Sequence, residues 1–518
     1  MSLQASRVYK YTRIFSNEDH LTPIKTEISL ERHIEVLQIT IPAYVMSIKS
    51  PPAHSAASLG LSDAILRLID KPGPRYTSYP TADRFSTRIG RSEYELALNQ
   101  RALAAGQGQP APVGLYVHVP FCESVCYYCA CNKVVTRQHD RATDYLKALE
   151  AEMRLHAQVL GYETPIASLH LGGGTPTFLR DAELTRLMRA IRQHFTFTPG
   201  AELAVEVDPR TVDSHRLGHL QALGFNRLSL GVQDFDAQVQ KAVHREQSCE
   251  QVRKLVACAN ALGYDSVNLD LIYGLPRQTE ASFRQTLDRV TEIRPNRLAL
   301  YAYAHLPHRF KPQRRIVEAE LPGTAQRLAM LGQAIEHLLT AGYVYIGMDH
   351  FALPKDELAV AKHQGRLHRN FQGYTAMPDL DLIGLGVSAI GRVGARHIQN
   401  VKEVSAYQQA IAQGEFAVER GLVLSRDDLV RRSVIMALMC QGRVEFESIE
   451  LAHLLSFESY FEQELRDLEP WQELGLLTRE SGALALTDRG WFGVRALAMV
   501  FDRHLRTAAT QSRYSRVA

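Results

Sequence analysis

The sequence lacks the features of a membrane-spanning or secreted protein. No run of eighteen apolar residues occurs in its 518 residues, and no charged start with a short apolar core and a small-residue cleavage site opens it. We therefore expect neither a membrane span nor a secretory signal. Cysteines are few, seven in all, and an odd number favours a reducing compartment over a disulfide scaffold. The expected location is the cytoplasm.

The charge pattern lacks a long basic face. Lysine and arginine total 59 against 56 aspartate and glutamate, which gives a formal net charge of +3 with both signs spread along the chain. Nucleic-acid binding needs a basic stripe, so we expect a small-molecule substrate and no nucleic acid. Hydrophobic residues at 45% and charged residues at 22% are ordinary for a globular protein, and the length predicts two or three domains.

One stretch contains most of the cysteines. Four of the seven fall within ten residues, in the pattern Cys-x3-Cys-x2-Cys followed by Ala-Cys-Asn-Lys, directly after an alternating strand. They are Cys122, Cys126, Cys129 and Cys131. Thiolates clustered this tightly suit a soft metal centre. Zinc is the second choice, because zinc sites usually take two separated pairs of ligands, and small buried hydrophobes are the bland alternative.

The spacing also indicates what kind of metal centre this is. Electron-transfer ferredoxins cap every iron of a four-iron cluster with a thiolate, so a motif of three cysteines leaves one iron free. An open metal position is a catalytic feature. Cys131 lies two residues past the third ligand, where geometry disfavours it as a fourth thiolate.

The chain then alternates between short apolar strands and helical stripes such as Leu184, Leu187 and Ile191. Six strands, each followed by a helical pattern, predict a parallel sheet. Six such units are too few to close an eight-stranded barrel, so we expect an open, partial barrel with its site at the C-terminal strand ends. The predicted strands cover residues 115–119, 168–171, 203–207, 227–232, 266–272 and 297–302.

Glycines and charged residues fall at or just past these strands. Gly172–Gly174 frees the backbone to approach an anion or an amino acid, although a tight strand-to-helix turn also explains a triple glycine. Glu206 and Asp270 lie in apolar strands, where a charge needs a partner. Each carboxylate pairs either with a ligand's ribose or sulfonium group or with a buried Arg or Lys. Arg245 falls in a helical stretch, where arginines are usually solvated.

At this point the sequence resembles a known superfamily. Cys-x3-Cys-x2-Cys after a strand is similar to the signature of the radical S-adenosylmethionine (SAM) enzymes, in which the methionine moiety chelates the fourth iron. More narrowly, the continuation Cys129-Ala-Cys131-Asn-Lys133 resembles the oxygen-independent coproporphyrinogen III oxidases. So do Pro74-Arg-Tyr-Thr-Ser-Tyr-Pro80, Gly347-Met-Asp-His-Phe351 and His368-Arg-Asn-Phe-Gln-Gly-Tyr-Thr375. The similarity runs from about Asp63 to the C-terminus.

The resemblance implies a role for particular residues. Cys122, Cys126 and Cys129 would bind a 4Fe-4S cluster, and Cys131 and Tyr116 would act near the reacting centre. Family positions that hold the cluster-bound SAM match Tyr116, Gly173, Glu206 and Ile390. Family positions that hold a second SAM match Tyr128, Gly174, Thr175, Gln233, Arg245, Asp270 and Ala304. Where some relatives have phenylalanine and glycine inside the motif, this chain has Tyr128 and Ala130.

The resemblance also implies an oxidoreductase reaction in haem biosynthesis. The reduced cluster would cleave SAM to methionine and a 5'-deoxyadenosyl radical, which removes a hydrogen from the β carbon of a substrate propionate. Loss of carbon dioxide and one electron leaves a vinyl group, and two propionates (rings A and B) of coproporphyrinogen III react to give protoporphyrinogen IX. A low-potential electron donor is required, and family likeness implies a monomer.

A tetracarboxylate substrate needs cations at its rim, because arginine pairs with carboxylates in a bidentate fashion. Arg75 and Arg369 are our candidates, with solvated surface arginines as the alternative.

Two further functions stay open. A related haem chaperone would share the barrel and the cluster motif without oxidase activity, but we expect it to lack Cys131-Asn-Lys133 and the segment around Arg75, both of which this chain has. A zinc or iron-sulfur interaction module without catalysis is disfavoured by a six-unit barrel.

The predicted fold class is α/β, a partial (β/α)6 radical SAM barrel with an N-terminal extension and a mainly α-helical C-terminal domain. Residues 1–62 form the extension, and those before Met46 would be poorly ordered. Residues 63–110 would cover the substrate, 111–400 would form the barrel, and 401–518 the helical domain. Within the last, Leu474-Gly-Leu-Leu477 and Leu486-Thr-Asp-Arg-Gly490 resemble a winged-helix-like element. Without a basic stripe, a lid or docking role is favoured over DNA binding.

Overall fold

The computed structural model describes residues 63–69, 71–106 and 111–505. All of them belong to one compact unit, Pro51–Ala518. The extension predicted for residues 1–62, including the expected disorder before Met46, lies outside the described residues.

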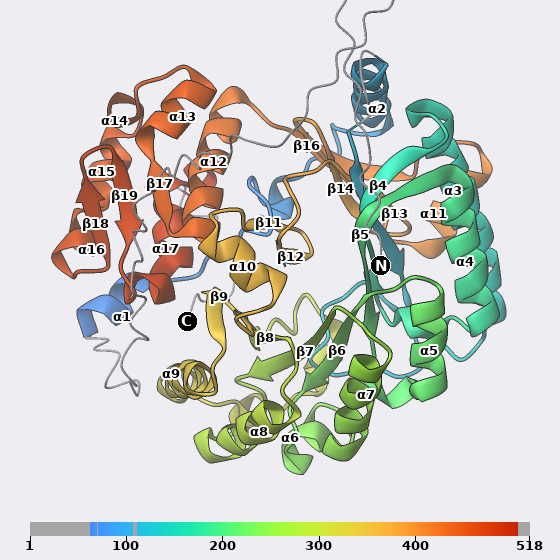
Figure 1. Cartoon of the computed structure of the whole chain (residues 1–518), viewed down its shortest axis with the longest axis horizontal. Helices are drawn as coiled ribbons and strands as arrows, with labels where there is room; N and C mark the ends of the chain where they lie inside the picture. The colour runs from blue at the N-terminus through green and yellow to red at the C-terminus, as the bar shows by residue number, and fades with distance from the viewer. Residues whose placement is uncertain (1–62, 70, 107–110, 506–518) are drawn as a thin grey trace, which may run out of the picture. The chain divides into compact units, whose positions relative to one another are not determined.

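A twelve-stranded sheet organises the described part of the chain (Figure 1). Its centre is a run of six parallel strands in chain order, which confirms the predicted set. They are β1 (Val113–Val119), β4 (Thr164–Gly173), β5 (Phe195–Val207), β6 (Arg227–Gln233), β7 (Ser266–Tyr273) and β8 (Arg297–Ala302). The sheet continues at both edges into other strands instead of closing, so it forms the open, partial barrel expected from six units.

Further strands extend this central run. β13 (Leu382–Leu385) lies parallel to β1, and antiparallel strands follow it at that edge. They are β14 (Ile390–Val393), β15 (Arg396–Asn400) and β16 (Val418–Val423). β10 (His350–Ala352) and β9 (Val344–Gly347) extend the opposite edge beside β8. Two small sheets pair β2 (Phe121–Cys122) with β3 (Val134–Val135), and β11 (His368–Asn370) with β12 (Gly373–Thr375).

Helices cover the outside of the curved sheet (Figure 1). In chain order these are α2 (Arg91–Ala105), α3 (Asp140–Leu160), α4 (Asp181–His194), α5 (Ser214–Ala222), α6 (Ala237–Ala242), α7 (Cys249–Ala261), α8 (Glu280–Ile293), α9 (Thr324–Thr340) and α11 (Val404–Ala412). α10 (Glu357–His363) instead contacts β9, and its Leu358 lines the interior of the barrel. The predicted stripe Leu184, Leu187 and Ile191 of α4 is fully buried. Burying each such side chain contributes about 1.5–3 kcal/mol.

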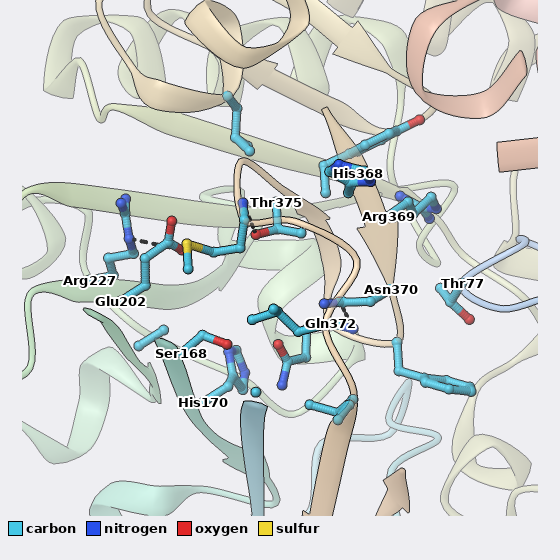
Figure 2. A pocket seen from close by; sticks show the side chains of 18 of the residues that line it. Thr77, Ser168, His170, Glu202, Arg227, His368, Arg369, Asn370, Gln372 and Thr375 are labelled. Atoms are coloured by element: carbon cyan, nitrogen blue, oxygen red, sulfur yellow. Dashed lines mark hydrogen bonds and ion pairs between the residues drawn. The ribbon is translucent and has the colours of Figure 1, made fainter. Parts of the chain in front are cut away.

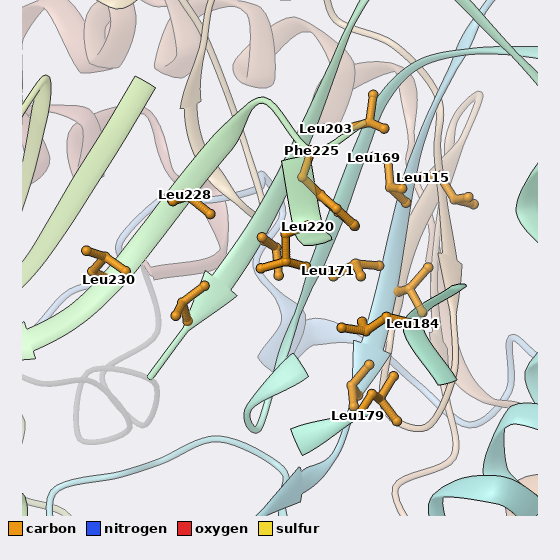
Figure 3. Packing of buried hydrophobic residues seen from close by; sticks show 14 of the residues in the cluster. Leu115, Leu169, Leu171, Leu179, Leu184, Leu203, Leu220, Phe225, Leu228 and Leu230 are labelled. Atoms are coloured by element: carbon orange, nitrogen blue, oxygen red, sulfur yellow. The ribbon is translucent and has the colours of Figure 1, made fainter. Parts of the chain in front are cut away.

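The strands separate an apolar face from a polar one. Alternate residues point to opposite faces, and the leucines of β1, β4, β5 and β6 pack together against the helices in a layer that Figure 3 shows. The residues between them face the interior of the barrel, and these are polar: Tyr116 and His118 on β1, His170 on β4, and Glu206 on β5. The alternation in the sequence therefore places these polar side chains inside the barrel.

A second hydrophobic core lies in the C-terminal region. It is built by α12 (Arg426–Gln441), α13 (Phe446–His453), α14 (Phe457–Tyr460), α15 (Glu462–Asp467), α16 (Glu469–Glu473), α17 (Val494–Ala498) and a small sheet of β17 (Arg443–Glu445), β18 (Leu477–Glu480) and β19 (Ala483–Leu486). Ile65 and Ile69 of α1 (Asp63–Ile69), together with Tyr76 and Tyr79, belong to the same core. The C-terminal region thus packs on the N-terminal segment. Nowhere in the described ranges is a helix both long and apolar enough for a membrane crossing.

Polar contacts fix the same N-terminal segment. The hydroxyl of Tyr76 donates to Asp502 Oδ2 at 2.9 Å, and Arg495 Nε donates to the carbonyl of Pro74 at 2.8 Å. Arg84 Nη2 donates to the carbonyl of His504 at 2.9 Å. These contacts hold the Pro74–Pro80 motif, and with it Arg75, in a defined place.

Two elements beyond residue 400 belong to the sheet side of the molecule. β16 pairs with β15, and α11 contacts α3. We therefore propose that the C-terminal domain begins near Arg426, at the start of α12, later than the boundary at residue 401 predicted from the sequence. The helical pattern after Arg426 agrees with the prediction, but a short, half-exposed edge strand such as β16 carries too little periodicity to be recognised.

A buried carboxylate joins α3 to the β13–β15 edge. Glu152 is 1% exposed and accepts hydrogen bonds from Gly386 N at 2.7 Å, Tyr407 Oη at 2.7 Å and Asn400 Nδ2 at 2.8 Å. Burial raises the pKa of Glu152 to about 7, and the three donors oppose that rise. The carboxyl group therefore titrates near neutral pH in the folded chain.

This titration predicts a pH dependence of stability. Between pH 4.5 and 7 the unfolded chain loses the Glu152 proton while the folded chain keeps it, so the stabilisation present below pH 4.5 disappears as the pH rises. Glu152→Gln removes the effect. The melting temperature of the variant relative to the wild type should therefore increase by a few degrees from pH 5 to pH 7.5, measured by calorimetry. Tyr407→Phe removes one donor but keeps the acid, so its pH dependence should persist. If the difference in melting temperature between Glu152→Gln and the wild type is the same at pH 5 and pH 7.5, the raised pKa of Glu152 is wrong.

Candidate active site

The cysteines lie in a loop at the C-terminal end of β1. We call residues 122–131 the cysteine loop. Its base is closed where β2 pairs with β3, and the amide of Thr136 donates to the carbonyl of Cys122 at 2.9 Å. Cys122 and Cys126 are buried, Cys129 is half-buried and Cys131 is exposed, and no disulfide joins any of them. The loop thus presents several free thiols close to the mouth of the barrel.

Cations face these sulfurs. Arg245 Nη1 lies 3.4 Å from Cys126 Sγ, and Arg210 Nη2 lies 3.7 Å from the same atom. Asp208 pairs with both arginines, at 3.2 Å and 2.7 Å, and holds them in place. One carboxylate against two guanidinium groups leaves a net positive charge beside the thiols, which would stabilise an anionic group bound there.

Cys129 and Cys131 interact directly. A hydrogen bond from the Cys131 thiol, with Lys133 nearby, lowers the pKa of Cys129 to about 5 although burial opposes this. Burial raises the pKa of Cys122 to about 11, and the hydroxyl of Thr175, 3.4 Å from its sulfur, opposes that rise. Cys131 is therefore a partner of the third predicted ligand, which explains why a fourth cysteine follows the motif so closely.

The donor set fits an iron-sulfur cluster. Among the residues that the structure describes, no three His, Cys, Asp or Glu side chains converge as the ligands of a single ion would. A four-iron cluster instead takes each thiolate at a different iron. Three thiols on one loop, backed by two arginines and Lys133, provide the soft donors and the positive surroundings that an anionic cluster needs.

The glycine turn after β4 supports the base of the cysteine loop. Gly173 has φ +115°, and a Cβ at Gly174 would lie 2.8 Å from the backbone of Pro120 and Phe121. The amide of Thr175 donates to the carbonyl of Phe121 at 2.8 Å. The turn therefore needs glycine for a close approach between two backbones, as well as for its geometry.

Gly174→Ala should displace the cysteine loop, because both clashing groups are backbone and cannot rotate away. We expect the iron content after anaerobic reconstitution to fall by at least half and the activity by about a hundredfold, the cost of misplacing a reacting group by 1 Å. Gly218→Ala is the matched control. Gly218 lies in α5 with no atom within 4 Å of a new Cβ, so this change should keep activity and stabilise the chain by about 0.5–1 kcal/mol. Normal iron content in Gly174→Ala contradicts the role of the turn.

Tyr116 and Glu206 form a polar layer inside the barrel. His118 Nε2 donates to the carbonyl of Asn132 at 2.9 Å, so its other nitrogen accepts from the Tyr116 hydroxyl at 3.0 Å. Burial lowers the pKa of His118, which keeps the ring neutral in this arrangement. The lone pairs of the Tyr116 hydroxyl remain available to a ligand.

Glu206 is a permanent anion in this layer. His170 Nε2 donates to its carboxylate at 3.0 Å and Gly173 N at 3.2 Å. These bonds lower the pKa of Glu206 although burial opposes them. The predicted alternative, an ion pair with arginine or lysine, is wrong here, because the partner is a histidine. An anionic carboxylate beside the glycine turn can accept from hydroxyl or ammonium groups of a ligand.

Asp270 lies on β7, two strands from Glu206. It accepts from Ser229 Oγ at 3.0 Å and from Asn268 Nδ2 at 2.8 Å. Burial, and secondly the charge of Glu206, raise its pKa to about 6. Among the described residues no arginine or lysine forms an ion pair with it, so the ion-pair alternative is wrong here too.

Arg245 departs from its sequence-based interpretation. It follows α6 in a loop and is 7% exposed, whereas the pattern favoured a solvated helical arginine. Its ion pair with Asp208 and its contact with Cys126 explain the burial, because both partners compensate the loss of water. Sequence periodicity could not reveal these partners, which come from other strand ends.

A buried glutamine joins two of the predicted cofactor residues. Gln313 Nε2 donates to the carbonyl of Tyr128 at 3.0 Å and to that of Ala304 at 3.1 Å. Gln233, a further predicted residue, has φ +71° at a register shift between β6 and β7. Such a conformation in a residue other than glycine often marks a functional site. Ile390 is the first residue of β14.

The barrel interior contains a cavity of about 200 Å³ (Figure 2). One wall carries His170, Glu202 and Arg227 from β4, β5 and β6, and the other wall is the β11–β12 hairpin. Glu206 and Asp270 line it too. The cavity therefore connects the predicted cofactor residues with the hairpin motif that the sequence singled out.

The two candidate arginines differ in their availability. Arg75 is engaged, since its guanidinium pairs with Asp349 at 3.3 Å and donates to the carbonyl of Ala302 at 3.0 Å. Arg369 is 5% exposed and lies over the Tyr374 ring, with Cζ 4.5 Å from the ring centroid. Its Nη2 donates to the Arg75 carbonyl at 3.4 Å, while Nε and Nη1 find no acceptor within the described residues. Arg369 therefore carries two unused buried donors in the cavity wall.

Several residues of this site were missed in the sequence. His118 and His170 occupy inward positions of alternating strands, so the period of two could have identified them. Arg210 and Gln313 gave no signal, because loops far apart in the chain bring them to the cysteines.

Comparisons with known proteins agree with this arrangement. A model of the radical SAM superfamily matches residues 116–290, and one of the HemN C-terminal domain matches residues 424–492. An oxygen-independent coproporphyrinogen III oxidase of Salmonella typhimurium is 47% identical over 88% of this chain and 98% of that protein. One of Pseudomonas aeruginosa is also 47% identical, with the same shares covered. The solved structure of coproporphyrinogen III oxidase (HemN) from Escherichia coli, described as a radical SAM enzyme, superposes with a TM-score of 0.80 at 46% identity, covering 83% of this chain and 98% of that one.

Proposed function

The chain belongs to the family of oxygen-independent coproporphyrinogen III oxidases, and from this premise we propose that it converts two propionate groups of coproporphyrinogen III into vinyl groups without molecular oxygen. The product is protoporphyrinogen IX, and the reacting propionates are those of rings A and B. The observation that carries the proposal is the loop with the free cysteines Cys122, Cys126 and Cys129 at the C-terminal end of a parallel strand, backed by Arg210 and Arg245.

Cys122, Cys126 and Cys129 are the proposed cluster ligands. When bound, a 4Fe-4S cluster and SAM supply the one-electron chemistry that removes hydrogen from an unactivated carbon. The chain contributes position and charge. Arg210 and Arg245 place positive charge beside Cys126, and the hydrogen bond from the Cys131 thiol stabilises anionic sulfur at Cys129. Cys131, exposed at the mouth, also offers a proton close to the reacting centre.

Two groups of residues are proposed to bind SAM. Tyr116, Gly173, Glu206 and Ile390 would hold the molecule at the cluster, supported by the free lone pairs of Tyr116 and the anionic Glu206. The second group would hold another SAM: Tyr128, Gly174, Thr175, Gln233, Arg245, Asp270 and Ala304. Its support is that Gln313 fixes the backbones of Tyr128 and Ala304 together.

Arg369 is the proposed anchor of a substrate carboxylate. Two unused donors on a buried guanidinium are costly unless an acceptor arrives, and a carboxylate supplies two acceptor oxygens in matching geometry. Arg75 instead supports the hairpin through its own carbonyl, which accepts from Arg369. The sequence-based candidates therefore divide into one substrate ligand and one supporting residue.

An anaerobic assay tests the function. The protein is reconstituted with iron and sulfide, then given dithionite, SAM and coproporphyrinogen III, and the product is analysed for vinyl groups by mass spectrometry. Vinyl product is the expected result. Haem binding without vinyl product would instead support the chaperone, an alternative that the intact Cys131-Asn-Lys133 and Arg75 segments already disfavour.

We also propose that the enzyme works as a cytoplasmic monomer with a low-potential electron donor. Free cysteines at all seven positions support a reducing compartment. The monomeric state rests on family resemblance and is checked by light scattering.

A further inference from the structure

A strongly basic segment follows β8 at the mouth of the barrel. We call residues 305–315 the basic segment. It contains four cationic side chains, Arg309, Lys311, Arg314 and Arg315, and no carboxylate. All four are exposed, in a chain whose total net charge is only +3. The density of positive charge in this segment is therefore well above the average for the chain.

The basic segment is fixed to the cysteine loop. Gln313, which lies inside the segment, is 1% exposed. Its amide donates to the carbonyl of Tyr128, between Cys126 and Cys129, and its Oε1 accepts from Leu306 N at 2.6 Å. A buried side chain with three hydrogen bonds places the segment firmly. The exposed cations thus lie beside the proposed cluster site in a rigid arrangement.

Two stacked aromatic rings, those of Tyr127 and His244, lie between the basic segment and the cysteines. Arg315 Cζ lies 5.2 Å from the ring centroid of Tyr127, the residue that follows Cys126. The Tyr127 ring stacks on His244 at 5.1 Å between centroids and 11° between planes. His244 is exposed, and its Nδ1 donates to the carbonyl of Val125 at 2.8 Å. The surface around Arg315 is therefore separated from Cys126 by one residue of the loop.

These cations lack carboxylate partners. Some exposed arginines elsewhere do pair with carboxylates, as Arg466 does with Glu462 and Arg479 with Glu458. Within the described ranges, Lys311, Arg314 and Arg315 form no ion pair; Arg314 binds the carbonyl of Pro307, and Arg315 covers Tyr127. Their charge is thus uncompensated and available to an external anionic surface.

We propose that Lys311, Arg314 and Arg315 form the docking surface for a small acidic electron-carrier protein that reduces the cluster. The inference rests on the proposed function, which needs one electron from outside. In the docked pair one electron passes from the reduced carrier to the oxidised cluster, and no bond forms or breaks. Complexes of this kind are small and short-lived, so complementary charge determines how fast they form. A basic surface next to the cluster loop shortens the path of the electron.

Charge reversal tests the surface. The probe is an acidic flavodoxin, and the variant is Lys311→Glu/Arg314→Glu/Arg315→Glu in the reconstituted enzyme. Two quantities are measured at 30 and 300 mM salt: flavodoxin binding by surface plasmon resonance, and cluster reduction by reduced flavodoxin in stopped flow. At low salt we expect binding and reduction rate to fall at least tenfold in the variant, within the 10–10³ range of electrostatic steering. The wild-type rate should fall similarly at high salt.

Two controls distinguish a loss of docking from a loss of the cluster or of its activity. Dithionite needs no docking surface, so it should reduce the variant and drive its turnover at the wild-type rate. Arg141→Glu/Arg154→Glu/Arg189→Glu reverses the same charge on exposed residues of α3 and α4 and should bind flavodoxin like the wild type. The proposal is overturned if the first variant binds and accepts electrons normally, or if wild-type rates ignore salt. If dithionite yields no vinyl product with the wild type, the proposed function itself fails, whatever flavodoxin does.

Discussion

Cys126→Ser should abolish cluster binding and, with it, the formation of vinyl product. The serine hydroxyl is a hard, weakly acidic donor that does not replace a thiolate at iron, although Arg210 and Arg245 would still face it. We expect the iron and sulfide content after reconstitution to approach zero. Activity should fall by more than about a hundredfold, beyond the 10–100-fold cost of losing a supporting partner. Metal analysis and the visible absorption of the reconstituted protein provide the measurement.

The control is Cys258→Ser. Cys258 is a free, half-buried cysteine on α7, away from the cysteine loop, so this variant should retain iron, absorption and activity. A Cys126→Ser protein that retains four irons and responds to SAM would refute the three-cysteine assignment. Equal losses in both variants would mean that serine destabilises the chain rather than the cluster.

Arg369→Met should weaken substrate binding while sparing the cluster. Methionine fills a similar volume next to Tyr374 but offers no donor to a carboxylate. Losing one member of a buried charge pair costs about 2–5 kcal/mol, which corresponds to a rise of roughly 30-fold or more in the KM for coproporphyrinogen III. Iron content and SAM cleavage without substrate should stay unchanged.

Two companion variants refine this test. Arg369→Lys keeps the charge but loses the bidentate geometry, so its KM should lie between those of the wild type and Arg369→Met. Arg366→Met removes an exposed arginine just before the same hairpin, one whose side chain donates hydrogen bonds to Gln364, and should leave the KM unchanged. An unchanged KM in Arg369→Met, or a loss confined to kcat, contradicts the anchoring role.

The fold was predictable wherever hydrophobic runs were long enough. All six central strands were recognised, but the expected β5, residues 203–207, covers only the second half of Phe195–Val207. Its first half contains Thr196, Pro199 and Gly200, which dilute the apolar pattern. The β13–β16 edge was missed because these strands are four to six residues long and contain glycine or polar residues.

The site was predictable where chemistry depends on spacing along the chain. Four cysteines in ten residues identified the cluster loop without any structure. Burial and pairing were not predictable in the same way. The environment of Arg245 is created by Asp208 and Cys126, and the unused donors of Arg369 depend on the hairpin's contact with Arg75. Such partners meet only after the sheet has formed.

The contact between Tyr76 and Asp502 has a consequence for synthesis on the ribosome. The two residues are 426 positions apart, and α1 shares a hydrophobic core with residues from α12 to Phe501. Domains fold as they emerge during translation. The barrel strands can therefore pair before the C-terminal residues that bind the segment around Arg75 have been synthesised. The entrance to the site is therefore completed only at the end of translation. A polypeptide that ends before Asp502 would carry the cysteine loop but lack the Tyr76–Asp502 contact that fixes the segment around Arg75.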